Sequence, residues 1–255
     1  MSHPSPDHSL WCRRYRPTDT ATARLVCLPH AGGSASFYLP VAAALSPGVD
    51  VVAVQYPGRQ DRRSERAVTD LSVLADRLYE VLKDDRDLPL TFFGHSMGAS
   101  LAFEVIRRME ADGYAPAWLF ASGRRAPSVF REENVHKLDD AGLLAEIRRL
   151  NGTESRLLDD EELMRAALPA LRADYTAAEL YRSGAEVTVN CPITVLTGDH
   201  DPKTSLDDAR AWAGHTASGA FDVQVFPGGH FFITDQTDEV IKVLDRHFQI
   251  GRAHV

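Results

Sequence analysis

The sequence predicts an α/β fold built on a mostly parallel β-sheet. Short apolar runs recur along the 255 residues, helical patterns separate them, and the composition of 44% hydrophobic and 25% charged residues is that of a globular protein. Near-continuous apolar runs are typical of strands buried on both faces, and helices between strands connect parallel neighbours. A chain of this length can bury a sizeable core without disulfides or metals. We therefore expect a single domain over residues 1–255.

Six apolar runs are the predicted strands, and turn residues follow each of them. In chain order they are RLVCLP (24–29), DVVAVQYP (50–57), LTFFG (90–94), AWLFASG (117–123), ITVLTG (193–198) and DVQVFPG (222–228). Helical spacing of apolar residues predicts helices over 71–85 and 99–113 between these strands. Gly113 stands where the second of these helices should stop.

Residues 126–190 interrupt this alternation, because no convincing strand occurs there. Helical spacing predicts helices over 138–150 and 163–181, and Pro169 should kink the second or begin a new helix. Long insertions of this kind are often lids, so we expect a helical lid over a ligand chamber. The residues that would face the chamber include Leu143, Ile147, Met164 and Leu168. The alternative is a helical layer that only packs on the domain.

Charge, cysteine content and hydropathy exclude several classes of protein. The net charge of -8 argues against a general nucleic-acid or anionic-membrane binder. The three cysteines are far apart and form no CxxC pair, so they read as free thiols in a reducing compartment. No apolar run approaches the ~20 residues of a membrane span, and the N-terminus lacks an apolar signal segment. We expect a cytoplasmic monomer without a nucleic-acid or membrane partner.

Chemically active side chains follow the strand ends, where parallel sheets bind their ligands. Ser96 lies in GHSMG (94–98), after a predicted strand and before a predicted helix. The G-x-S-x-G spacing alone arises by chance, but a strand–turn–helix setting exposes such a serine in a tight turn. The helix then offers its free N–H groups and positive dipole end to an oxyanion. We therefore predict Ser96 as a nucleophile, with the N–H of Met97 as one oxyanion donor.

The base and the acid should follow the serine in the chain. His230 follows the last strand, and both Asp199 and Asp201 follow the strand before it. We prefer Asp201 as the acid, since a carboxylate further along the turn clears the strand end, while Asp199 would bond its own turn. The second oxyanion donor is expected from HAGG (30–33), as the N–H of Ala31. The nearby histidines lack metal-ligand spacing, so no metal is expected.

Six segments, in the same order along the chain, resemble the type II thioesterases. These are stand-alone α/β-hydrolases that accompany modular polyketide synthases and nonribosomal peptide synthetases. The segments are LPHAGGSASFY, VQYPGRQDRRSE, FFGHSMGASLAFE, LRADYTAAELY, TGDHDPK and PGGHFFI. The resemblance implies an α/β-hydrolase fold with a lid, a triad of Ser96, Asp201 and His230, and an oxyanion hole from the N–H groups of Ala31 and Met97.

The same resemblance implies the activity and the partner. Acyl thioesters on the phosphopantetheine arm of acyl or peptidyl carrier proteins would be hydrolysed through an acyl-serine, which clears stalled or aberrant acyl groups. No cofactor of the enzyme's own is implied. A small-molecule esterase or an acyltransferase would use the same acyl-serine, so both remain alternatives. A non-catalytic hydrolase-fold receptor is a further alternative, although such proteins usually lack a triad member.

Two arginine clusters follow strand ends on the predicted site face. They are Arg59, Arg62 and Arg63, and Arg124 and Arg125. Arginines in such positions are usually solvated or paired with nearby acids. Carrier proteins, however, are generally acidic, and phosphopantetheine carries a phosphate. We therefore hypothesise that these arginines dock the carrier protein.

Overall fold

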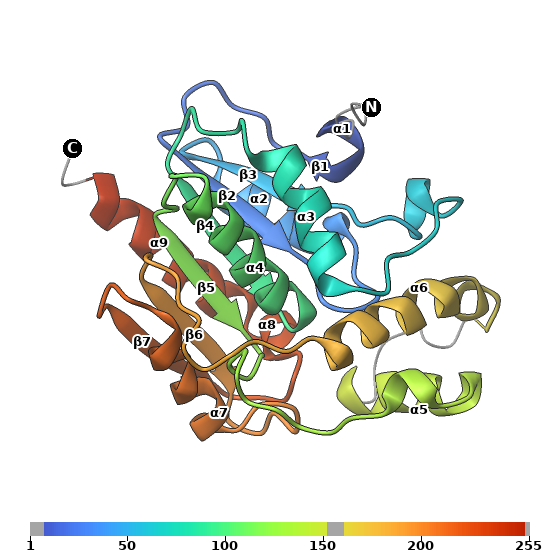
Figure 1. Cartoon of the computed structure of the whole chain (residues 1–255). Coiled ribbons are helices and arrows are strands. Elements are labelled where there is room, and N and C mark those ends of the chain that lie inside the picture. The colour runs from blue at the N-terminus through green and yellow to red at the C-terminus, as the bar shows by residue number, and fades with distance from the viewer. Residues whose placement is uncertain (1–7, 152–160, 253–255) are drawn as a thin grey trace.

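The computed structural model describes residues 8–151 and 161–252, which form a twisted sheet with helices on both faces (Figure 1). The seven-stranded sheet has the order β1-β3-β2-β4-β5-β6-β7. Its strands are β1 (Cys12–Arg13), β2 (Ala23–Leu28), β3 (Val49–Val54), β4 (Leu90–His95), β5 (Trp118–Ser122), β6 (Ile193–Gly198) and β7 (Phe221–Phe226). β2 to β7 pair in parallel, and β1 pairs antiparallel with β3. All six predicted strands are present, and the mostly parallel sheet is confirmed.

The strands are buried on both faces, which explains their unbroken apolar sequences. On β2, Val26 and Leu28 belong to the core beneath α3 (Leu71–Leu82) and α4 (Met97–Ala111). Their neighbours Leu25 and Cys27 belong to the core beneath α2 (Leu39–Leu45) and α9 (Thr237–Arg252). The remaining short helices are α1 (His8–Trp11), α7 (Leu206–Arg210) and α8 (Phe232–Asp235).

The ends of the predicted helices have local causes. Asp70 caps α3 by accepting hydrogen bonds from the N–H groups of Ser72 and Val73. After α4, Gly113 adopts a φ of 79° and the N–H of Tyr114 donates to Met109 O at 2.9 Å, so the predicted stop is confirmed. α9 is not among the predicted helices, although its buried Val240, Val243, Leu244 and Phe248 follow helical spacing.

Two long helices lie between β5 and β6 and extend beyond the carboxyl edge of the sheet (Figure 1). They are α5 (Asp140–Asn151) and α6 (Glu161–Leu180), so the predicted helical insertion is confirmed. Pro169 lies inside α6, and no new helix begins there. Residues 152–160 lie outside the described part of the chain. We call α5, α6 and the preceding segment 126–139 the lid.

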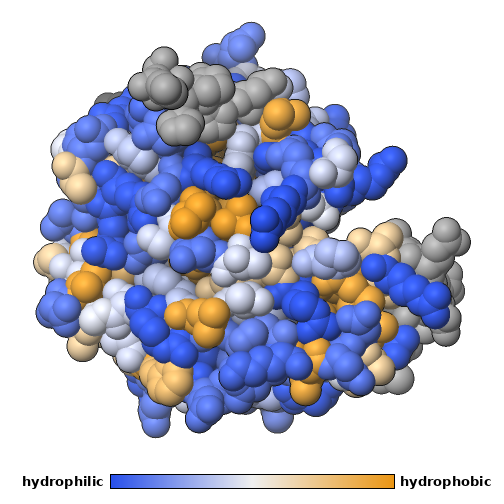
Figure 2. All heavy atoms as spheres, turned by 45° about the vertical axis from the view of Figure 1, so that its right-hand side comes forward, coloured by the Kyte–Doolittle hydropathy of each residue, from blue (hydrophilic) through white to orange (hydrophobic). Residues whose placement is uncertain are grey.

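The visible surface is mainly polar. Hydrophilic residues dominate the face seen in Figure 2, and apolar residues occur there in separate patches. None of the described helices combines the length and the apolar character that crossing a membrane requires.

Candidate active site

The turn between β4 and α4 holds Ser96 in a strained conformation. Its φ of 54° and ψ of -117° lie in a region that residues with a side chain rarely adopt. A Cβ at Gly94 would lie 2.2 Å from Gly98 O, and a Cβ at Gly98 would lie 2.1 Å from Leu28 O. The two glycines of the motif therefore allow the strand and helix to approach closely enough to form this turn.

Ser96, His230 and Asp201 form one hydrogen-bonded chain. The Nε2 atom of His230 lies 3.0 Å from Ser96 Oγ, and its Nδ1 atom lies 3.0 and 3.1 Å from the two carboxylate oxygens of Asp201. His230 follows β7 and Asp201 follows β6, so three loops at the same sheet edge supply the chain. The side chain of His230 is 4% exposed and that of Asp201 is fully buried. This is the geometry of a nucleophile, a base and an orienting acid.

The two candidate acids have different surroundings. Asp199 is exposed, and its Oδ1 accepts a hydrogen bond from the N–H of Gly228 at 2.9 Å and contacts His200 Nδ1 at 2.6 Å. It thus joins the turns after β6 and β7, and these hydrogen bonds lower its pKa. Asp201 reaches His230 and also accepts from the N–H of Lys203 at 2.8 Å. The structure therefore places Asp201, and not Asp199, against the imidazole.

Ala31 and Met97 line the same cavity as Ser96 and His230. In the ranges that the structure describes, the N–H groups of Ala31 and Met97 have no protein acceptor. The next residue, Gly32, donates its N–H to Asp174 Oδ2 at 2.7 Å, which fixes the loop. Two backbone donors thus remain available beside the serine, as an oxyanion hole requires.

Two further histidines, half-buried His30 and buried His95, lie near the base. Burial first, and then the nearby His230 and Arg59, lower the pKa of His30 to about 3. Burial also lowers the pKa of His95 well below its ordinary value, and its Nδ1 lies 2.9 Å from Ser122 Oγ. Both rings are therefore neutral at pH 7 and pack as aromatic groups. The described residues contain no group of three metal-ligating side chains suited to a metal ion.

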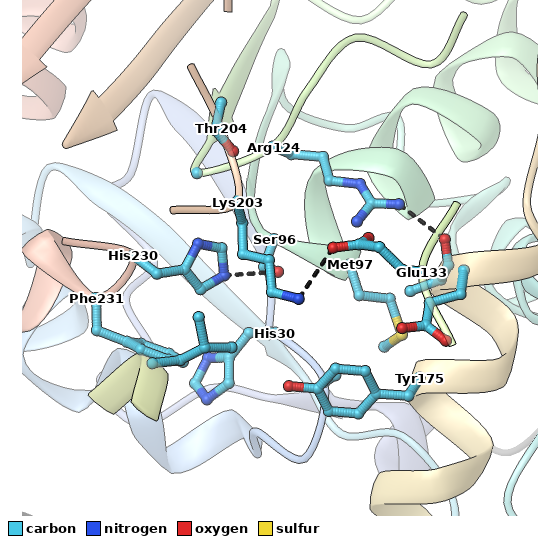
Figure 3. A pocket seen from close by; sticks show the side chains of 15 residues that line it. His30, Ser96, Met97, Arg124, Glu133, Tyr175, Lys203, Thr204, His230 and Phe231 are labelled. Atoms are coloured by element: carbon cyan, nitrogen blue, oxygen red, sulfur yellow. Dashed lines mark hydrogen bonds and ion pairs between the residues drawn. The ribbon is translucent and has the colours of Figure 1, made fainter. Parts of the chain in front are cut away.

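The cavity at Ser96 has a volume of about 40 Å³ (Figure 3). Among the described residues, the lid contributes these lining residues: Glu133, Leu150, Tyr175, Ala178 and Glu179. The predicted inward-facing residues are not among them, so that prediction is wrong. They pack with one another and with Val135 and Leu171 in a separate apolar cluster of the lid; they are Leu143, Ile147, Met164 and Leu168. Helical periodicity identifies an apolar face but does not specify which surface covers it.

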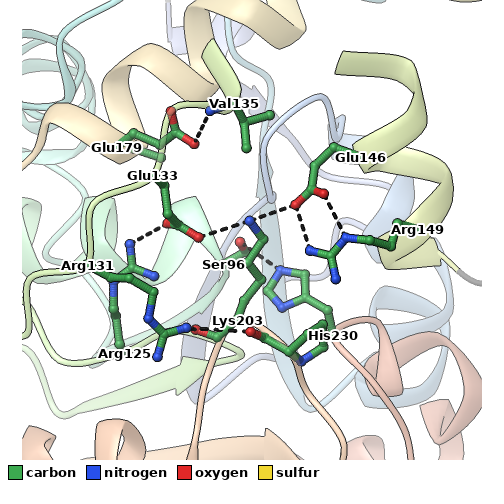
Figure 4. Close-up of polar contacts among 12 residues, drawn as sticks. Ser96, Arg125, Arg131, Glu133, Val135, Glu146, Arg149, Glu179, Lys203 and His230 are labelled. Atoms are coloured by element: carbon green, nitrogen blue, oxygen red, sulfur yellow. Dashed lines mark hydrogen bonds and ion pairs between the residues drawn. The ribbon is translucent and has the colours of Figure 1, made fainter. Parts of the chain in front are cut away.

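A chain of charged side chains connects the lid to the loop that carries Asp201 (Figure 4). Lys203 Nζ lies 2.9 Å from Glu133 Oε1 and 2.8 Å from Glu146 Oε1 on α5. Each of the two glutamates has a second cationic partner. Arg125 Nη2 lies 2.5 Å from Glu133 Oε2, and Arg149 Nε lies 2.8 Å from Glu146 Oε2. Burial alone would raise the pKa of Glu133, but hydrogen bonds from Arg125 and Lys203 lower it to about 2. No local sequence pattern predicts this network, because its members are far apart in the sequence.

The structure corrects most of the docking hypothesis. Arg59 is buried and binds both carboxylate oxygens of Asp174 on α6, at 2.7 and 2.8 Å. Arg62 is buried and pairs with Glu65, at 2.6 Å.

Arg125 is likewise buried against Glu133. These three arginines, Arg59, Arg62 and Arg125, are thus held by acids of the same chain and do not form an exposed docking surface. Arg63 is exposed and Arg124 lines the cavity, so their docking role stays a prediction.

The thioesterase domain family matches residues 23–248, which include all three residues of the hydrogen-bonded chain. The chain belongs to the thioesterase family. This thioesterase is 46% identical to the thioesterase PikA5 of Streptomyces venezuelae, over 96% of this chain and 88% of the relative. It is 54% identical to a probable cadicidin biosynthesis thioesterase of Streptomyces griseus over 90% of this chain, and it spans 63% of that relative.

A solved structure supports the same assignment. The type II thioesterase BorB from the borrelidin biosynthetic cluster superposes on this thioesterase with a TM-score of 0.85 and 47% identity. The match covers 94% of this chain and 97% of BorB. The resemblance to type II thioesterases and the α/β-hydrolase fold are confirmed.

Proposed function

We propose that this thioesterase hydrolyses acyl thioesters carried on the phosphopantetheine arm of an acyl or peptidyl carrier protein. Its role would be to clear stalled or aberrant acyl groups during polyketide or nonribosomal peptide biosynthesis. The observation that carries the proposal is the Ser96–His230–Asp201 hydrogen-bonded chain, which opens into a cavity bounded by the lid. The relatives named for cadicidin and borrelidin biosynthesis favour this setting.

The first half of the reaction forms an acyl-enzyme. His230 Nε2 takes the proton of Ser96 as its Oγ attacks the thioester carbonyl carbon, and Asp201 holds the ring and stabilises the imidazolium. The N–H groups of Ala31 and Met97 stabilise the negative charge on the carbonyl oxygen. The C–S bond then breaks, and His230 returns the proton to the departing thiolate. A thiol has a pKa of about 8.5, so its departure needs less help from an acid than that of an amine.

The second half of the reaction releases the acid. His230 takes a proton from water, which attacks the acyl-serine carbonyl, and the ester bond to Ser96 Oγ breaks as that oxygen regains a proton. The products are a carboxylic acid and the carrier with its free thiol. The chain's own residues carry out every step, and we propose that no cofactor is required.

The decisive experiment compares two donors of the same acyl group. The thioesterase is incubated with a panel of acyl-carrier proteins, and mass spectrometry measures the mass of each carrier afterwards. The kcat/KM for each acyl-carrier protein is then compared with the kcat/KM for the p-nitrophenyl ester of the same acyl group. We expect higher kcat/KM on the carrier and loss of the acyl mass. Preference for the ester would indicate a small-molecule esterase, and acyl products on an added amine or alcohol would indicate an acyltransferase. We also propose that the thioesterase is a monomer, and light scattering of the same sample tests this.

A further inference from the structure

A second cavity lies beside the catalytic cavity and is lined by four arginines. Its volume is about 10 Å³, which is room for about one water-sized group. Arg124 lines both cavities and therefore lies between them. The remaining lining residues are Ser100, Arg125, Ala126, Pro127, Val129, Arg131, Tyr181 and Arg182. We call this space the arginine cavity.

Two of the four arginines have carboxylate partners. Arg125 pairs with Glu133 at 2.5 Å, and Arg131 pairs with Asp208 at 2.8 Å. Neither Glu133 nor Asp208 lines the arginine cavity. The carboxylates therefore approach these arginines from outside and leave the cavity itself lined by cationic and neutral groups.

The other two arginines have no carboxylate partner within residues 8–151 and 161–252. Arg124 donates from Nε to Ser100 Oγ at 3.1 Å and from Nη2 to Ala178 O at 2.8 Å. Arg182 donates from Nη1 to the backbone oxygens of Glu179 and Tyr181. Both arginines thus bond only neutral acceptors.

The surroundings of Arg124 are unfavourable for its charge. Burial first, and then the charge of Arg125, lower the pKa of Arg124 to about 10, although the carboxylates of Glu133 and Glu179 oppose this shift. The guanidinium is still protonated at pH 7. A half-buried guanidinium held by neutral acceptors loses favourable solvation, and an anion in the cavity would offset that loss with charge-assisted hydrogen bonds.

We propose that the arginine cavity receives one oxygen of an anionic group of the substrate. The inference deepens the proposed function and rests on it. Carrier-bound substrates offer two such groups, a carboxylate on the acyl chain and the phosphate of the arm. Both present charged oxygens that accept hydrogen bonds from a guanidinium.

The position of the cavity favours the carboxylate. Ser100 lies four residues after Ser96 on α4, which is about 6 Å along the helix axis. A carboxylate a few bonds from the thioester carbonyl can span a distance of this size. The phosphate lies at the far end of the pantetheine chain and reaches the cavity only if the arm folds back.

Two pairs of small thioesters test the proposal and distinguish a carboxylate on the acyl chain from the phosphate of the arm. Glutaryl and valeryl N-acetylcysteamine thioesters differ in one carboxylate and carry no phosphate. Propionyl-phosphopantetheine and propionyl-pantetheine differ in one phosphate. For each pair we measure the ratio of kcat/KM, anionic over neutral, in the wild type and in Arg124→Gln and Arg182→Gln. Arg77→Gln, on an exposed position of α3, is the matched control.

We expect both variants to lower the glutaryl/valeryl ratio about tenfold or more, because each variant loses a hydrogen bond to a charged group. Arg77→Gln should leave the ratio unchanged. A fall confined to the phosphate pair would assign the cavity to the arm. Equal ratios in wild type and variants for both pairs would overturn the proposal. Arg182 is exposed, so its variant remains informative if Arg124→Gln does not fold. If wild type fails on propionyl thioesters altogether, the proposed function fails instead.

Discussion

The catalytic edge of the sheet and the lid are held together by different kinds of contact. Ser96, Asp201 and His230 follow β4, β6 and β7, whose parallel pairing through β5 fixes where the three loops meet. In the lid, the apolar faces of α5 and α6 cover each other, and ion pairs such as Lys203–Glu146 connect them to the rest of the chain. The sheet thus imposes the triad geometry, while the lid depends on side-chain contacts that other arrangements of two helices would also satisfy.

The largest effect that separates the two acids should come from Asp201. We expect Asp201→Asn to lower kcat by about 10⁴, as loss of the orienting charge does in a serine protease. Asp199→Asn should cost far less, because Asp199 contacts the turn after β7 and not the imidazole. Steady-state kinetics on one acyl thioester checks both. A larger loss in Asp199→Asn would show that the geometry misidentifies the acid.

The rigidity of the catalytic edge can be tested at Gly98. A methyl group there would overlap Leu28 O, so Gly98→Ala should destabilise the protein by on the order of 3 kcal/mol. Gly214→Ala is the control, since a Cβ at Gly214 meets no atom within 4 Å. Urea unfolding measures the difference. Equal stability of the two variants would mean that the strand and helix can separate without cost.

The lid should show two separable effects. Leu143 lies in the lid's own apolar cluster, so Leu143→Ala should destabilise the lid by about 2–3 kcal/mol without changing acyl-length preference. Leu150 lines the catalytic cavity, and Leu150→Ala should shift the preference toward longer chains. Hydrogen exchange of α5 measures the stability of the lid, and kcat/KM over a series of acyl thioesters measures the acyl-length preference. If Leu143→Ala changes the acyl-length preference and Leu150→Ala does not, Leu143 contacts the acyl chain and our assignment of the two residues is wrong.

The smallest predicted effect is a pH dependence of the lid contacts. The pKa of Glu133 falls from 4.5 to about 2 on folding, so its ion pairs stabilise the protein fully above pH 4.5. That stabilisation is lost as the pH falls toward 2. Thermal unfolding between pH 5 and pH 3 should therefore show a larger loss of Tm in the wild type than in Glu133→Gln. If the wild type and Glu133→Gln lose Tm equally, the ion pairs of Glu133 do not cause the pH dependence.

Local sequence patterns predicted the parts of the molecule that the backbone determines. GHSMG, GDHD and GGH lie at the ends of three apolar strands, and parallel pairing brings such strand ends together. The sequence therefore sufficed to predict the members of the Ser96–His230–Asp201 hydrogen-bonded chain. The pair Arg59–Asp174 joins residues 115 positions apart, and no local pattern indicates it. The same holds for Lys203 between Glu133 and Glu146, because ion pairs depend on tertiary placement. The apolar face of α5 was recognisable, but its partner was not.

The most direct test of the account is the site of covalent modification. The thioesterase is treated with an active-site-directed phosphonate fluoride, digested, and mapped by mass spectrometry. We expect one adduct, on the peptide that carries Ser96, and none in Ser96→Ala, which should also leave acyl-carrier protein intact while retaining the wild-type fold by circular dichroism. An adduct on a different serine, or undiminished turnover by purified Ser96→Ala, would contradict the proposed nucleophile.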